Sequence, residues 1–130
     1  MDTLPDLDSL KFNADGLIPA IAQQHDTGEV LMMAWMNRDS LAETLKSGVA
    51  CYWSRSRQKF WKKGESSGHV QKIKAMRTDC DRDTILILVD QIDVACHTGR
   101  RTCFYLEADE SGWREILAPE KDPKEMYGNS

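Results

Sequence analysis

The stretch Thr78-Asp-Cys-Asp-Arg-Asp-Thr-Ile-Leu-Ile-Leu-Val89 combines the chain's strongest strand signal with its densest group of metal-binding side chains. Its last six residues form an apolar run typical of a buried strand. If the first six are also extended, alternation puts Asp79, Asp81 and Asp83 on one face and Cys80 on the other. The oxygen face suits Mg²⁺ or Ca²⁺, and the sulfur suits Zn²⁺.

Each half of this pattern has a second interpretation. Clustered aspartates are also typical of a solvated turn, and scattered cysteines are often small buried hydrophobic residues. Two further thiols follow at Cys96 and Cys103, but the spacing is not that of a zinc finger or ribbon. Three thiolates with one open position describe a catalytic zinc site better than a closed structural one.

The length of 130 residues predicts one domain spanning residues 1–130, with peripheral or loose segments at 1–15 and 118–130. Hydrophobic residues make up 41% of the chain and charged residues 29%, which is ordinary globular composition. No apolar run approaches the ~18 residues of a membrane helix. The acidic start lacks the features of a signal peptide. We therefore expect a cytoplasmic protein with no membrane partner, whose four cysteines serve as metal ligands or buried thiols.

Seventeen basic residues against 21 acidic ones give a net charge of −4, which argues against a general nucleic-acid binder. The charge is uneven, because residues 55–77 contain eight basic residues and one acid, a net +7. This basic segment suits a small anionic ligand such as a phosphate, although a solvated basic surface is the alternative.

The predicted fold class is α+β, about seven strands in a mostly antiparallel sheet with one clear helix. The segment 29–36 is predicted to be buried on both faces, with its methionines filling the core, and 55–68 to be a long irregular loop. In that loop Trp61 can either stack on a base or pack, whereas Cys51 is assigned to the core. The main predicted elements are strands over 17–23, 29–36, 49–54, 69–76, 84–89 and 102–108, a turn over 25–28 and a helix over about 40–46.

Five stretches together resemble one known family: GLIPAIAQ (16–23), GEVLMMAWMN (28–37), CYWSRSRQKFWKKGESSGH (51–69), TDCDRD (78–83) and ACHTGRRTCF (95–104). They resemble the monofunctional phosphoribosyl-AMP cyclohydrolases, enzymes of histidine biosynthesis. The stretches occur in the family's order and cover nearly everything from Gly16 to Phe104.

The resemblance implies an intertwined homodimer that uses zinc and magnesium. Some family members fuse a second, pyrophosphohydrolase domain, and we expect this chain to hold only the cyclohydrolase domain. The implied ligands are Cys80, Cys96 and Cys103 for zinc, with Cys80 supplied by the other subunit, and Asp79, Asp81 and Asp83 for magnesium.

The implied reaction is hydrolysis of the adenine ring of N1-(5-phosphoribosyl)-AMP at the N1–C6 bond. Zinc suits this chemistry because it lowers the pKa of a water toward ~7. The candidates for moving the proton are His97 and His69, although His97 can instead be a hydrogen-bond partner that orients the site. The candidates for contacting the phosphates are Arg55, Arg57, Lys62 and Lys63.

Two other metal-site interpretations were compared with this one. Zinc nucleoside deaminases attack the same adenine carbon, but they carry H-x-E and P-C-x-x-C motifs that this sequence lacks. A structural zinc module without catalysis requires a fourth protein ligand and leaves no position for water.

Overall fold

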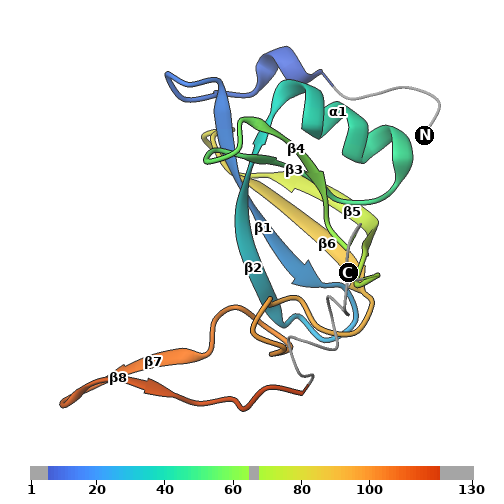
Figure 1. Cartoon of the computed structure of the whole chain (residues 1–130). Helices are drawn as coiled ribbons and strands as arrows, with labels where there is room; N and C mark the ends of the chain where they lie inside the picture. Colours follow the sequence, from blue (N-terminus) through green and yellow to red (C-terminus); the bar gives the residue numbers. More distant parts are fainter. Residues whose placement is uncertain (1–5, 65–67, 121–130) are drawn as a thin grey trace.

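The computed structural model describes residues 6–64 and 68–120, and within them the α+β prediction is confirmed (Figure 1). Residues 1–5 and 121–130, most of the segments predicted to be loose, lie outside the described residues. The elements are a 3₁₀ turn at Leu7–Ser9, β1 (Leu17–Gln24), β2 (Val30–Asn37), α1 (Arg38–Ser47), β3 (Cys51–Ser54), β4 (Lys59–Lys62), β5 (Gln71–Thr78), β6 (Ile85–Gln91), β7 (Leu106–Asp109) and β8 (Gly112–Glu115).

The main sheet has the strand order β2-β1-β6-β5. Its outer pairs are antiparallel, whereas β1 and β6 run parallel. The β3–β4 hairpin is joined to this sheet through β5, because Val49 bridges Lys72 and the Ala50 N–H donates to Gln71 O. The hairpin and α1 therefore lie against the sheet, and the core forms between them (Figure 1).

The core is built from alternating strand positions, as a sheet buried on one face requires. Along β6 the side chains of Ile85, Ile87 and Val89 are almost completely buried, and the intervening residues are less so. The apolar run predicted over 84–89 is thus confirmed as a central strand.

Helix α1 begins at a reciprocal pair of capping hydrogen bonds. Asn37 is the N-cap: its side chain accepts from the Ser40 N–H, and the Ser40 hydroxyl accepts from the Asn37 N–H. This reciprocal pair lets the helix begin at Arg38, two residues before the predicted start. Gly48 ends it with φ of 78°, a conformation that glycine adopts without strain.

Three strand predictions need correction. The strand predicted over 29–36 is β2, but it is an edge strand, so Val30 and Met33 are each 42% exposed instead of buried. The loop predicted over 55–68 contains β4, which pairs with β3. The strand predicted over 102–108 begins only at Leu106, and Cys103 lies in the preceding loop.

The aspartate cluster is not extended, so the alternation argument was wrong about its geometry. Residues 79–83 form the turn between β5 and β6, in which the Arg82 N–H donates to Asp79 O and Arg82 has φ of 59°. The solvated-turn interpretation describes the backbone correctly. Among the described residues, no helix is both long and apolar enough to cross a bilayer.

Candidate functional site

The turn between β5 and β6 brings three carboxylates together, although the predicted extended strand does not form there. Asp79, Asp81 and Asp83 are exposed, and each offers an oxygen within 4.8 Å of the others. Hydrogen bonds from the N–H groups of Asp83 (3.1 Å) and Thr84 (3.3 Å) orient the Asp79 carboxylate. Desolvation would raise the pKa of Asp79, but these hydrogen bonds outweigh it and lower that pKa. An anionic all-oxygen group of this size fits a hard divalent cation.

Two of the three predicted zinc ligands meet at the other end of the sheet. Cys96 is buried, and the Thr98 hydroxyl lies 3.0 Å from its sulfur. Cys103 as a whole residue is exposed, yet its thiol is desolvated and lies close enough to Cys96 for that residue to affect its pKa. Burial raises the pKa of Cys103 to about 12, an effect increased by Cys96 and opposed by Lys63. This pair of soft donors fits part of a zinc site.

Lys63 lies beside these thiols instead of at the exposed tip of the hairpin. It is 6% exposed, burial lowers its pKa, and the charges of Cys103 and Cys96 oppose that shift. Its backbone position is set by the N–H bond to Ala50 O at 3.0 Å. A cationic side chain in this position can neutralise a thiolate or meet an anionic ligand that enters between the loops.

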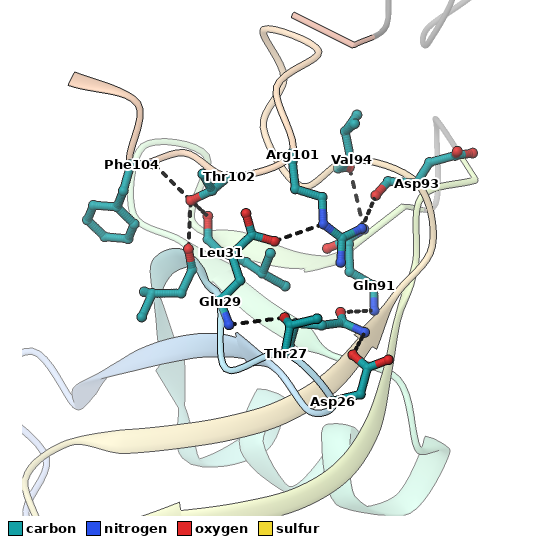
Figure 2. A network of polar contacts seen from close by, with 12 residues as sticks. Asp26, Thr27, Glu29, Leu31, Gln91, Asp93, Val94, Arg101, Thr102 and Phe104 are labelled. Carbon is teal, nitrogen blue, oxygen red and sulfur yellow. Dashed lines mark hydrogen bonds and ion pairs between the residues drawn. The ribbon is translucent and has the colours of Figure 1, made fainter. Parts of the chain in front are cut away.

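The segment carrying the thiols is held to the sheet by a polar network (Figure 2). The Cys103 N–H donates to Leu31 O at 2.7 Å, and the Thr102 hydroxyl donates to Val30 O, also at 2.7 Å. The Arg101 guanidinium bonds to Glu29 (2.9 Å) and to the carbonyl of Asp93 (2.8 Å). These contacts attach Cys103 to the first residues of β2.

Cys80 does not join the other two thiols within one chain. It lies in the turn before β6, whereas Cys96 follows the opposite end of that strand. The seven residues of β6 separate the two ends by about 20 Å. In the described part of the chain, the cluster of metal-binding side chains is the aspartate turn, and the cysteines form no comparable group of three.

The two histidine candidates have different surroundings. His69 is 7% exposed, and its Nε2 lies 3.6 Å from the Asp93 carboxylate. His97 is exposed and directly follows Cys96. His97 therefore lies within the loop that carries Cys96 and Cys103, called here the thiol loop, and His69 contacts Asp93, which lies just before that loop. The Asp93 carboxylate can also orient the His69 ring.

The remaining basic candidates lie on the β3–β4 hairpin. Arg55 stacks over the Trp35 ring at 4.9 Å and lines a cavity of about 350 Å³ together with Asp15, Asn37 and Trp53. Arg57 is exposed in the hairpin turn. Lys62 forms an exposed ion pair with Glu43 at 3.5 Å.

The alternatives for two neighbouring side chains are also decided. Trp61 packs, because its ring lies 5.1 Å from that of the buried Tyr52. Cys51 is 1% exposed, as its assignment to the core requires.

Sequence reasoning missed the residues that hold the site's loops in place. Thr102 was treated only as part of a strand, Arg101 appeared only within the stretch 95–104, and Gln91 was not noticed. Their sequence signal is weak, because single polar residues at strand ends are common. A glutamine that continues an apolar alternating row, as Gln91 does after Val89, is the one clue that was available.

Comparisons with known proteins find one family. The family model described as phosphoribosyl-AMP cyclohydrolase matches residues 32–105. A phosphoribosyl-AMP cyclohydrolase of Magnetococcus marinus is 70% identical over 128 residues, covering 98% of this chain and 99% of that protein. Proteins of the same name from Rhodospirillum rubrum (62% identical; 92% of this chain, 85% of the relative) and Paramagnetospirillum magneticum (60%; 98% and 96%) are also similar.

Proposed function

The chain belongs to the phosphoribosyl-AMP cyclohydrolase family, enzymes of a histidine biosynthesis step, and from this premise we propose that it opens the adenine ring of N1-(5-phosphoribosyl)-AMP with the help of metal ions. Water adds to C6, and the N1–C6 bond breaks. The water oxygen becomes the carboxamide oxygen, and N1 leaves C6 with a proton. The product is the formimino-aminoimidazole-carboxamide ribonucleotide.

The observation that carries the proposal is the meeting of Cys96 and Cys103 beside the buried Lys63. We propose that these thiols and Cys80 of a second copy hold zinc, and that Asp79, Asp81 and Asp83 hold magnesium. When bound, zinc supplies the Lewis acidity that lets a water lose a proton near neutral pH. Magnesium supplies positive charge for phosphate oxygens or for the dimer contact.

The chain's own residues then bind the substrate and move the proton. We propose that Arg55 and Arg57 contact phosphate oxygens, because guanidinium groups form paired hydrogen bonds with them. Lys62 and Lys63 remain candidates for the same role, with Lys63 supplying charge beside the thiols. His69, whose imidazole faces Asp93, and His97, next to Cys96, are the proposed groups for accepting the proton of water and delivering it to N1.

The homodimer is proposed on two grounds. Cys80 lies before β6 and the other thiols lie after it, so the length of β6 keeps Cys80 from reaching them in its own chain. The proposed zinc site therefore needs a second copy. The β7–β8 hairpin, in orange and red, extends away from the body and exposes apolar side chains (Figure 1). Trp113 is 75% exposed, Phe104 54% and Leu106 50%, which suits a surface that a partner covers.

A zinc module without catalysis is the alternative. It needs a fourth protein ligand, whereas the proposed set has three, Cys96 and Cys103 of one chain and Cys80 of a second copy, and leaves one position for water. We propose the cytoplasm as the location, where cysteines stay reduced and can serve as metal ligands.

The experiment is to incubate the purified protein, with zinc and magnesium, with phosphoribosyl-AMP and to follow the ultraviolet spectrum. Ring opening changes the chromophore from an adenine to an imidazole carboxamide. The proposal predicts a spectral change that requires enzyme and is lost on chelation. An unchanged spectrum with metal-loaded, folded protein would refute it.

A further inference from the structure

A line of buried polar side chains crosses the end of the core next to the thiol loop. The Tyr52 hydroxyl donates to Gln71 Oε1 at 2.6 Å, and Gln71 Nε2 donates to Gln91 Oε1 at 2.8 Å. Gln91 Nε2 then donates to the main-chain carbonyls of His69 (3.0 Å) and Ile92 (2.9 Å). The three side chains are at most 4% exposed.

The direction of these hydrogen bonds is fixed by the final acceptors, the main-chain carbonyls of His69 and Ile92. Main-chain carbonyls only accept, so the Gln91 side chain must turn its NH₂ group toward His69 and Ile92. Its oxygen then faces Gln71, which must offer its own NH₂, and this leaves the Gln71 oxygen for Tyr52. Burial raises the pKa of Tyr52 well above its ordinary range, so the hydroxyl keeps the proton that it donates.

Gln91 joins two segments that carry proposed catalytic groups. The Nε2 group of Gln91 donates to the main-chain carbonyl of His69, two residues before β5 begins. The same group donates to Ile92 O and, at 3.4 Å, to Val94 O, just before the loop with Cys96 and His97 (Figure 2). The Gln91 N–H also donates to Gln24 Oε1 at 2.9 Å, which attaches the same residue to β1.

We propose that Gln91 is a positioning residue of the ring-opening reaction: its carboxamide clamps the His69 main chain to the segment that leads into Cys96 and His97. The clamp sets the separation between the His69 imidazole, its Asp93 partner and the thiol loop. This inference rests on the proposed function. Displacing a reacting group by about 1 Å can cost up to ~100-fold in rate, so the clamp acts on turnover more than on substrate binding.

The decisive variant is Gln91→Glu, which keeps shape and size but replaces the donating NH₂ with an oxygen facing two carbonyls. Gln91→Met removes the donors without burying a charge and serves if the first variant does not fold. The matched control is Gln23→Glu, since the Gln23 amide also donates to a main-chain carbonyl, Gly28 O at 2.8 Å, but in an exposed turn. All variants are compared at a temperature where circular dichroism shows them folded.

The inference predicts a fall in kcat of roughly 10- to 100-fold per zinc-loaded site, a KM within about threefold of wild type, and faster amide hydrogen exchange at residues 92–96. Gln23→Glu should match wild type. A kcat within threefold of wild type, or a loss fully explained by lower zinc content, would overturn it.

The hydrogen-exchange result separates this inference from the proposed function. If wild type fails to turn over phosphoribosyl-AMP, the function is wrong, but exchange at residues 92–96 still tests the clamp. Unchanged protection in a folded Gln91 variant means that the amide does not hold this segment, whatever the substrate is.

Discussion

The proposed shared zinc site predicts that two inactive variants restore each other. Cys80→Ala removes the thiol that each chain gives to its partner, and Cys96→Ala removes a thiol that each chain keeps. Neither homodimer then has a complete site. In a mixed dimer, the Cys96→Ala chain supplies Cys80, and the Cys80→Ala chain supplies Cys96 and Cys103.

The geometry supports the assumption behind this prediction. Two sulfurs bound to one zinc lie within about 4.6 Å of each other, since each Zn–S bond is about 2.3 Å. Cys80 and Cys96 are separated by the length of β6, about 20 Å. A site within one chain would therefore require the sheet to break.

The expected recovery follows from random exchange. About half of all dimers are mixed, and each mixed dimer has one whole site and one broken site, so about a quarter of all sites should recover. The assay unfolds, mixes and refolds the two variants, then measures bound zinc and turnover. Mass spectrometry confirms that chains have exchanged.

A control pair makes the result specific. Cys96→Ala mixed with Cys103→Ala cannot form a whole site, because both lesions lie in the half that each chain keeps. The shared arrangement predicts recovery for the first mixture and none for the second. If both mixtures stay at the background of the separate variants despite confirmed exchange, the reasoning about the shared site is refuted.

Four other outcomes are expected. Cys96→Ala should lose zinc while Cys51→Ala, a core change, keeps it; elemental analysis that finds full zinc in both would exclude Cys96 as a ligand. Asp81→Asn removes one anionic oxygen and should weaken the response of activity to Mg²⁺, so a normal Mg²⁺ titration would count against the hard-metal site. His97→Ala should lower kcat by ~10²–10⁴ with zinc retained if His97 moves protons, whereas parallel loss of zinc indicates an orienting role. Thr102→Val removes the partner of two part-buried main-chain groups, the Val30 carbonyl and the Phe104 N–H, and should destabilise the fold by about 1–3 kcal/mol, which urea unfolding at fixed protein concentration measures; a change below about 0.5 kcal/mol would show that water replaces the hydroxyl.

The strands of the main sheet were predictable because period-2 burial is a local property of sequence. β1 and β6 lie at the centre of the sheet, so their apolar rows appear directly in the residue pattern. β4 was missed for the opposite reason. Its four residues, KFWK, are mostly exposed, and their strand conformation depends on pairing with β3 across a turn.

The aspartate cluster shows a correct grouping reached by a wrong geometry. Alternation would have brought the carboxylates to one face of a strand, but the turn curls them toward one another around the Asp79 side chain. An extended run would have kept the Asp79 and Asp83 backbones about 13 Å apart, so the turn is what brings the three carboxylates within reach of one ion. The thiol pair could not be located in the same way, since Cys96 and Cys103 meet through a turn closed by main-chain hydrogen bonds and through the contact of Cys103 with β2.

The glutamines explain how the strands themselves determine where the core ends and the site begins. The buried rows of β1 and β6 finish at the same end of the sheet, with Gln24 and Gln91, and there they meet Gln71, the one buried residue of β5. A buried amide is costly unless its donors and acceptors are paired. Gln71 pairs with Gln91 and accepts from Tyr52, and Gln24 is satisfied by two aspartates and the Gln91 N–H. The NH₂ group of Gln91 is left, and the main-chain carbonyls of the adjoining segments accept from it. The apolar parts of the rows therefore stabilise the sheet, while their polar ends require the loop before Cys96 to close over them in one arrangement.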